Sequence, residues 1–422
     1  MENKFINAAF VAAAVATGVA AYESDYDVSR EGKVYRGLVV VNTEGVSTPA
    51  RGFELVESPE QEPKAFQNLT PLGQRQQFLI GSELRKRYVE EAKVLAENYV
   101  VSELSMQTPF FGKHILSMQA QMMGLYPASD ANDLTEWQQG NAVPPVEGAD
   151  FSEWQQELGA HALPHGLNIF PIEQTGLEAD YLLSVNEQNC PLFKKVFYST
   201  AMDLDYIALQ GLPYKWSDFV KQRGSTMHEF CEYLEWAWLT STPLKDQVNM
   251  DNLRRDNCHT YNTQYVNALR QFEEENSNLV ASEFVEELKE KIAHAAGIQN
   301  WSETKRFSRM KKRLQAEHSN ADPLPNVYHA YTAFTPDHLY LFAFATLDRN
   351  DLDRATYGVR VLPNASTLIF EVDSSNNVHA YLNDRQVTPA GCQPRADCPA
   401  SVFVNELSKK ITFTDIAEAC QQ

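Results

Sequence analysis

The spacing of apolar positions predicts alternating strands and helices after residue 33. Residues 34–42 (VYRGLVVVN) form a β-branched run, typical of a strand buried on both faces. A helix is expected to open at Thr70-Pro71-Leu72-Gly73 and to run to about residue 97, with a strand at 97–104 and a second helix at 113–125. This order is typical of a βαβ unit and therefore of a parallel sheet.

The middle of the chain, 128–315, has few β-branched runs and several helical stretches. Helices are expected at 216–240, 253–275 and 281–296, and the basic stretch 304–317 is expected to be a solvated helix face. Strand character returns at 339–347 (LYLFAFATL) and 366–372 (STLIFEV), and 378–382 is expected to pair with the latter. The pattern predicts an α/β core that is split in sequence by a helical insertion.

An uncharged, Ala-rich segment runs from residue 5 to residue 22. Cationic groups precede it and acidic residues follow it, which places the main domain on the non-cytosolic side of a membrane. The segment is either a short membrane anchor or a signal peptide cleaved near Val19-Ala20-Ala21. A buried Ala-rich helix is the third alternative.

Composition excludes some classes of protein and some partners. Hydrophobic residues make up 43% and charged residues 22%, which is ordinary for a globular chain and excludes a disordered or polytopic membrane protein. The 36 Lys and Arg against 56 Asp and Glu give a net charge of −20. We expect no nucleic-acid partner, because a polyanion would be repelled.

Six cysteines, an even number, suggest disulfides if the domain is non-cytosolic. Cys392 and Cys398 enclose a short loop with a proline, and theirs is the one pairing that the sequence favours. No Cys-x-x-Cys pair, Gly-rich phosphate loop or Walker motif occurs, so no metal and no cofactor are expected. His161 and His165 have the spacing of a helical metal pair, but Pro164 between them makes a helix doubtful.

Two segments carry motifs of a known family. Residues 68–89 contain an L-T-x-x-G-x-x-Q pattern and then Leu-Arg-x-Arg-Tyr, and residues 116–127 contain Ser-x-Gln and then Gly-Leu-Tyr-Pro. They resemble the histidine acid phosphatases, whose last catalytic strand would match 339–346. The resemblance implies a phosphoglycerate-mutase/acid-phosphatase-like α/β sheet flanked by helices. It also implies the organisation 1–24 hydrophobic N-terminal helix, 33–127 first half of the core, 128–315 helical cap, and 316–422 second half and tail.

The catalytic positions of that family are replaced. The family has Arg-His-Gly-x-Arg-x-Pro after the first strand, where the histidine accepts the phosphate and the arginines hold its oxygens. Here Thr43 and Ser47 stand for the arginines and Glu44 for the histidine. Lys113 lies near the sequence position at which the family has a further phosphate-binding arginine. Phe344 and Ala345 are aligned with the late His-Asp pair that contains the proton donor.

Phosphoryl transfer depends on cationic groups around the transferring oxygens. At the matching places the charges of Lys113 and Glu44 cancel, and a carboxylate repels a phosphate dianion. The resemblance therefore implies a catalytically inactive fold.

Three functions follow as hypotheses. The first is a structural or accessory subunit of a membrane complex, with other protein subunits as partners and residues 5–22 in the membrane. Two membranes remain as alternatives. One is a mitochondrial inner membrane, with the domain in the intermembrane space, and the other is a secretory or surface membrane. The second is a secreted or lumenal ligand-binding module lined by Thr43, Glu44, Ser47 and Lys113. The third is a residual acid phosphohydrolase that uses Glu44 as its nucleophile.

Overall fold

The computed structural model describes residues 33–186, 188–193, 207–262, 264, 273–298, 327–356, 362–394, 396–411, 413 and 415–421. The hydrophobic segment 5–22 and the basic stretch 304–317 lie outside these ranges, so both remain predictions. Among the helices inside them, none is both long and apolar enough to cross a membrane.

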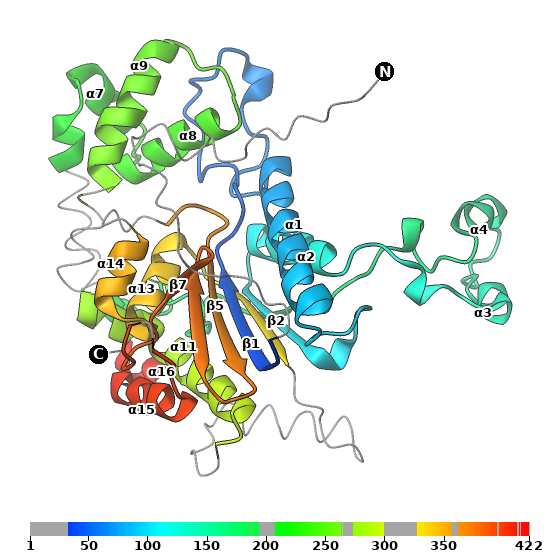
Figure 1. Cartoon of the computed structure of the whole chain (residues 1–422). Helices are drawn as coiled ribbons and strands as arrows, with labels where there is room; N and C mark the ends of the chain where they lie inside the picture. Colours follow the sequence, from blue (N-terminus) through cyan, green and yellow to red (C-terminus); the bar gives the residue numbers. More distant parts are fainter. Residues whose placement is uncertain are drawn as a thin grey trace, which may run out of the picture.

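One mixed seven-stranded sheet, in the order β3-β2-β4-β1-β5-β6-β7, forms the centre of the molecule (Figure 1). β1 pairs in parallel with β4, which also pairs in parallel with β2, while β5, β6 and β7 continue the sheet as antiparallel strands. The parallel arrangement predicted for the first two strands is confirmed, with β4 inserted between them. The strands are β1 (Tyr35–Asn42), β2 (Leu104–Pro109), β3 (Glu173–Thr175), β4 (Tyr328–Thr332), β5 (Thr367–Asp373), β6 (Val378–Leu382) and β7 (Arg385–Val387).

Helices cover both faces of the sheet, which is why β1 is apolar at nearly every position. Leu38 and Val40 pack in one cluster with α1 (Pro71–Arg85) and α2 (Gly112–Leu125). Val39 and Val41 pack in a second cluster, on the opposite face. Its helices are α11 (Glu273–Ala295), α13 (Pro336–Thr346), α15 (Ala400–Lys410) and α16 (Ile416–Ala419) (Figure 1).

The helices α1 and α2 touch backbone to backbone through two glycines. A Cβ atom on Gly81 would lie 1.8 Å from the carbonyl oxygen of Gln121, and one on Gly124 would lie 2.1 Å from that of Phe78. Any larger residue would force the helices apart. This contact fixes where the N-terminal end of α2 lies relative to β1.

A separate apolar cluster forms a cap from α7 (Tyr214–Gln222), α8 (Met227–Leu239), α9 (Gln247–Asn252) and the π-helical turn Leu253–Cys258. Phe53, Leu55 and Val56, which follow β1, pack in the same cluster, so the cap lies toward the carboxyl end of β1. The predicted insertion 128–315 supplies this cap, and it also supplies β3 and α11 to the layers of the core. The remaining helical elements are α3 (Glu136–Asn141), α4 (Ser152–Leu158), α5 (Pro191–Phe193), α14 (Arg349–Ala355), the π-helical turn Lys86–Glu91 and the 3-10 turns Pro59–Gln61, Val101–Glu103, Asp130–Asn132 and Pro164–Gly166.

Most elements flanking the cap are where the sequence predicts them, but the strand predicted at 339–347 is wrong. The stretch predicted as a strand is helix α13, which Thr335 caps through its side chain and Pro336 begins. Every residue from His338 to Thr346 is buried, so neither helical nor strand periodicity is visible in the sequence. The strand predicted at 97–104 is also displaced, because β2 starts only at Leu104. The single helix predicted at 216–240 is broken at Gly224, whose φ is +58°.

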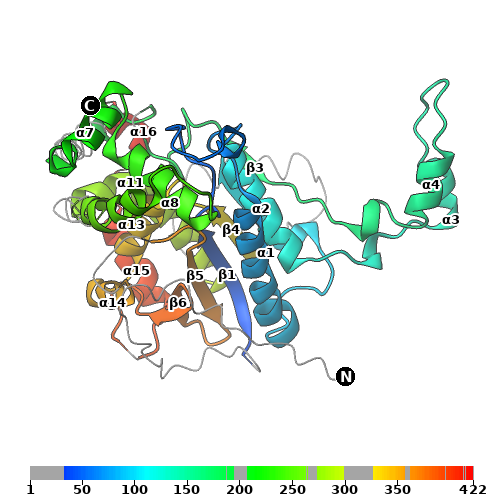
Figure 2. The same ribbon diagram turned by 90° about the horizontal axis from the view of Figure 1, so that it is seen from above.

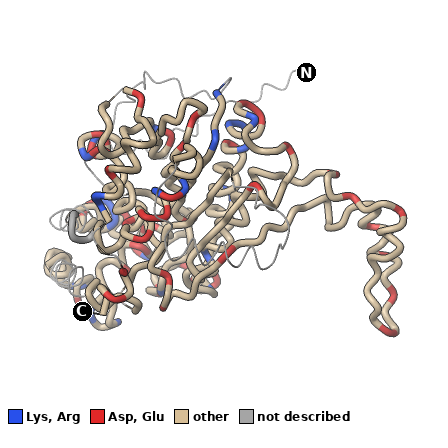
Figure 3. The backbone as a smooth tube through the Cα atoms, turned by 90° about the horizontal axis from the view of Figure 1, so that it is seen from below, with Lys and Arg blue, Asp and Glu red and all other residues tan. Residues whose placement is uncertain are grey.

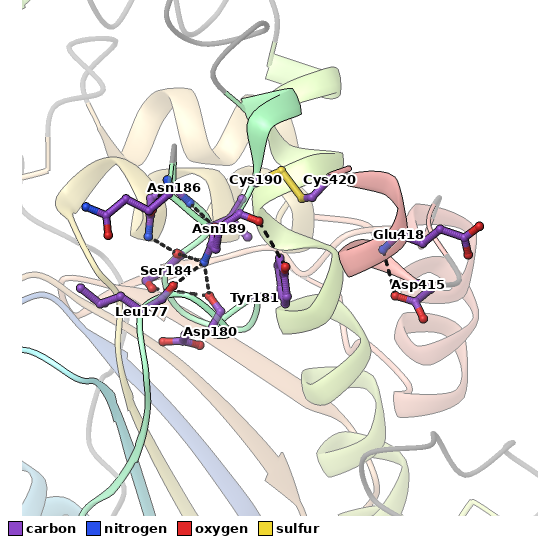
Figure 4. The surroundings of a disulfide bond; sticks show 12 residues. Leu177, Asp180, Tyr181, Ser184, Asn186, Asn189, Cys190, Asp415, Glu418 and Cys420 are labelled. Carbon is purple, nitrogen blue, oxygen red and sulfur yellow. Dashed lines mark hydrogen bonds between the residues drawn. A yellow bond between two sulfur atoms is a disulfide. The ribbon is translucent and has the colours of Figure 1, made fainter. Parts of the chain in front are cut away.

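All six cysteines are paired, as Cys190–Cys420, Cys231–Cys258 and Cys392–Cys398. The predicted Cys392–Cys398 pair is confirmed. Cys190–Cys420 joins α16 to the turn that precedes α5 (Figure 4). There the side-chain amide of Asn189 donates to the carbonyl oxygens of Leu177, Asp180 and Ser184. Disulfides of this kind persist in oxidising compartments, so the domain is of a non-cytosolic type.

Candidate functional site

Three consecutive polar residues are buried at the carboxyl end of β1. Asn42 and Thr43 are 0% exposed and Glu44 is 4% exposed. The hydroxyl of Thr43 accepts from the backbone N–H of Ser366, and the carbonyl oxygen of Thr43 accepts from Nε2 of Gln77 at 2.8 Å. In open α/β sheets, sites form at this edge of parallel strands.

The residues of the L-T-x-x-G-x-x-Q pattern hold the turn that follows Glu44. The hydroxyl of Thr70 donates to the carbonyl oxygen of Val46 at 2.6 Å, and Oε1 of Gln76 accepts from the N–H of Val46 at 3.0 Å. Gly45 and Gly73 meet so closely that a Cβ on Gly45 would lie 2.4 Å from the carbonyl oxygen of Gly73. The pattern thus preserves the shape of the turn, independently of which side chains the turn carries.

The carboxylate of Glu44 forms a buried ion pair with Lys113 at the N-terminal end of α2. Lys113 Nζ lies 2.7 Å from Glu44 Oε1, and the side chains are 13% and 5% exposed. Burial alone would raise the pKa of Glu44, but the charge and hydrogen bond of Lys113 outweigh it, and the net effect is to lower that pKa. Burial alone would lower the pKa of Lys113, but Glu44 outweighs it and raises that pKa. Both groups are therefore charged at neutral pH.

Two histidines that the sequence analysis did not select lie beside this pair. His114 Nε2 is 3.8 Å from Glu44 Oε2 and donates to the carbonyl oxygen of Phe334 at 3.0 Å. His338 Nε2 donates to the carbonyl oxygen of Val185 at 2.8 Å. Burial lowers the pKa of His114 to about 4 and the pKa of His338 to about 4. Both imidazoles are neutral above that pH, and each donates from Nε2 to a backbone carbonyl oxygen.

The four predicted lining residues are only partly brought together. Glu44 and Lys113 bind each other, and Thr43 is next to them with its hydroxyl engaged by the backbone of Ser366. Ser47 is half-buried and forms a β-bridge with Leu69. The cap adds a second carboxylate, because the charge of Glu232 on α8 also raises the pKa of Lys113. The site therefore has two carboxylates around one ammonium group.

The pair aligned with the proton donor, Phe344 and Ala345, lies near the C-terminal end of α13. The ring of Phe344 packs under the guanidinium group of Arg349, whose Cζ is 4.7 Å from the ring centroid. The residues of α13 that lie near Glu44 are at its other end, where His338 feels the charge of Glu44. Because 339–346 is a helix and β4 ends before it, the alignment of Phe344 and Ala345 with the late His-Asp pair loses its basis.

Two other places in the described structure bring together groups that could bind a ligand. Asp130, Asp133 and His161 bring three possible metal-ligand atoms within 4.8 Å of one another, but His161 Nδ1 already bonds Asp133 at 2.7 Å and the group lies at the surface. A cavity of about 120 Å³ at the opposite end of β1 is lined by Arg36, Lys291 and His294 among others. Its lining on β1 runs from Arg36 to Val39, which is about 17–26 Å of extended strand before Glu44, so the cavity is not part of this site.

The fold has known relatives among solved structures. Hafnia alvei phytase in its apo form has a TM-score of 0.50 at 13% identity and covers 93% of this chain and 99% of that one. Klebsiella sp. ASR1 phytase has a TM-score of 0.51 at 12% identity, over 89% of this chain and 96% of that one. No family model matches the sequence.

A curated Caenorhabditis elegans protein, described as "Putative acid phosphatase", is 28% identical over 85 residues. That match covers 18% of this chain and 20% of the relative. The chain shares the fold of these phytases, and the resemblance seen in the sequence is confirmed at the level of the fold.

We expect Lys113→Met to destabilise the protein by about 3–5 kcal/mol, because it leaves the Glu44 carboxylate buried without a counter-charge. The double variant Lys113→Met/Glu44→Gln should recover much of that loss. The exposed pair Lys409–Glu406 is the matched control, and Lys409→Met should cost no more than about 1 kcal/mol. Denaturant unfolding measures all three, and equal losses for Lys113→Met and Lys409→Met would contradict the role of the buried pair.

We also expect stability to fall as the pH is lowered from about 6.5 to about 4. The folded pKa values of His114 and His338 lie near 4, below their ordinary value of 6.5. The unfolded chain therefore binds protons first, and stability that is complete above pH 6.5 is lost through this window. The midpoint of urea unfolding against pH is the measurement. The double variant His114→Gln/His338→Gln should have a flatter profile between these pH values, and an unchanged slope would show that other groups are responsible.

Proposed function

We propose that this chain is a non-catalytic member of the acid phosphatase fold, in which an internal ion pair occupies the former phosphate position. The observation that carries the proposal is the buried Glu44–Lys113 contact at the carboxyl end of β1. Lys113, the one cationic side chain that the alignment places in the pocket, is already neutralised by Glu44. The L-T-x-x-G-x-x-Q residues that hold the turn after Glu44 are present although the catalytic residues of the family are replaced. This combination supports a role that needs the fold and not the reaction.

Electrostatics supports the proposal. Catalysts of phosphoryl transfer place cationic groups where charge develops on the transferring oxygens. Here Glu44 and Glu232 outnumber Lys113, and the low dielectric of a buried site strengthens their repulsion of a phosphate dianion. His114, which could in principle accept a phosphoryl group, is 0% exposed and donates to backbone.

We expect no turnover of p-nitrophenyl phosphate or inositol hexakisphosphate between pH 4 and 7. We also expect no shift of the thermal unfolding midpoint by either compound, because Lys113 is already paired with Glu44. The Glu44→Ala variant is the informative control. Turnover that Glu44→Ala abolishes would establish the residual hydrolase instead. A thermal shift that Glu44→Ala or Lys113→Ala removes would establish a ligand-binding pocket lined by Thr43, Glu44, Ser47 and Lys113.

The wider role that we propose is that of an accessory subunit in a membrane-bound complex. The uncharged run 5–22 supports an anchor, the three disulfides support a non-cytosolic position for the domain, and the inactive site supports a structural task. A mitochondrial inner membrane with the domain in the intermembrane space and a secretory or surface membrane both satisfy these conditions.

We expect the native protein, extracted in mild detergent, to migrate on a native gel within a particle of several times its own mass. Deleting residues 1–24 should release the domain from membranes, because it removes the whole hydrophobic run. The Glu44→Gln/Lys113→Met variant should still assemble, because the pocket is not the contact surface in this proposal. Migration of the intact protein as a free monomer would contradict the accessory role.

A further inference from the structure

An arm formed by residues 129–166 projects from the body of the molecule and carries α3 and α4 at its end (Figures 1 and 2). No residue from 131 to 165 is buried. The two limbs of the arm are joined at its root, where the N–H of Ser129 donates to the carbonyl oxygen of Gly166 at 3.1 Å and that of Leu134 to Ala160 at 2.7 Å. A Cβ on Gly166, whose φ is +69°, would lie 2.4 Å from the Ser129 carbonyl oxygen, so the root requires a glycine.

Nearly the same short sequence lies at the start of both helices of the arm. Residues 135–139 are Thr-Glu-Trp-Gln-Gln and residues 152–156 are Ser-Glu-Trp-Gln-Gln. In α3, Thr135 forms a capping box with Gln138, which sets the start of the helix. In α4 the matching Ser152 is already inside the helix, and the N-cap is Phe151, so the two copies are offset by one helical position. Each copy still places its tryptophan in the first turn of its helix, and the side chains of Trp137 and Trp154 are 81% and 60% exposed.

The two helices of the arm are poorly stabilised by the rest of the chain. α3 has 6 residues and α4 has 7, well below the ~12–15 that an isolated helix needs in water. Neither helix has a buried residue. Tryptophan is among the residues that contribute most to protein–protein binding when it enters a pocket on a partner. Two exposed tryptophans on an arm that projects from the body of the molecule therefore indicate an interaction surface.

The charge of the arm restricts what can bind it. Its carboxylates are Asp130, Asp133, Glu136, Glu147, Asp150, Glu153 and Glu157, and it contains no Lys or Arg (Figure 3). Nucleic acid and anionic lipid would be repelled. A second copy of this chain is disfavoured as a whole, because its net charge of −20 has the same sign as the arm. A basic protein surface matches, because its cations can pair with the carboxylates and stack on the indole rings.

We propose that the arm docks on a basic surface of another protein, with Trp137 and Trp154 inserted into that surface and the surrounding carboxylates paired with its Lys and Arg side chains. The inference is independent of the proposed loss of catalysis, because the arm shares no residue with the site around Glu44. It assigns the contact to a part of the chain distinct from the former active site and from the hydrophobic segment 5–22.

The first experiment compares Trp137→Ala/Trp154→Ala with Tyr214→Ala in the full-length protein. Tyr214 on α7 is 82% exposed and lies outside the arm, so it is a matched aromatic control. Neither variant should change the thermal unfolding midpoint, because neither removes a buried side chain. The tryptophan variant should weaken association in native membranes by about tenfold or more, and the control should not. Equal effects of the two variants, or none from the tryptophan variant, would overturn the proposal.

The second experiment identifies the chemistry of the contact. A photo-reactive amino acid at position 137 or 154 of the full-length protein is activated in native membranes, and the cross-linked residues are identified by mass spectrometry. A cross-link within a Lys- or Arg-rich surface of another protein supports the proposal. A cross-link to a second copy of this chain, to lipid, or to a neutral or acidic protein surface overturns it, as does the absence of any cross-link. Charge reversal by Glu136→Lys/Glu153→Lys should reduce the cross-link yield several-fold.

Discussion

A carboxylate buried at the end of the central strand is the constraint on which the rest of the site depends. Glu44 is 4% exposed, and a buried charge without a partner is prohibitively costly. Lys113 supplies that partner from α2, and α2 can reach it because the glycine contact with α1 fixes its position. The pair therefore leaves Lys113 neutralised at this end of β1, with two neutral histidines beside it.

The part of the fold that the sequence predicts is the part whose burial pattern is regular. β1 is apolar on both faces, α2 ends at Tyr126-Pro127, and β5 and β6 are short, mostly apolar runs with polar flanks. α13 was missed because it is buried on every side, so the run LYLFAFATL has no helical period to detect. Its cap, Thr335, and the following Pro336 were the available signals.

The sequence predicts some of the residues of the site, but it does not predict how they are arranged in space. Glu44 and Lys113 were selected separately, from two motifs, and only the three-dimensional arrangement shows that they neutralise each other. His114 and His338 were not selected, because their positions near Glu44 depend on where α2 and α13 begin. The duplicated Glu-Trp-Gln-Gln sequence of the arm was visible in the sequence, but its exposure was not.

The disulfide between Cys190 and Cys420 has a consequence for the order of synthesis. Its two cysteines are 230 residues apart, so at about 5–20 residues per second the first waits roughly 10–50 s before the second has been made. The interval before β1 can pair in the sheet is longer still, because both of its neighbours, β4 and β5, come from the last quarter of the chain. During that interval an apolar strand and an unpaired thiol are exposed. The disulfide and the centre of the sheet can therefore form only after nearly the whole chain has been made.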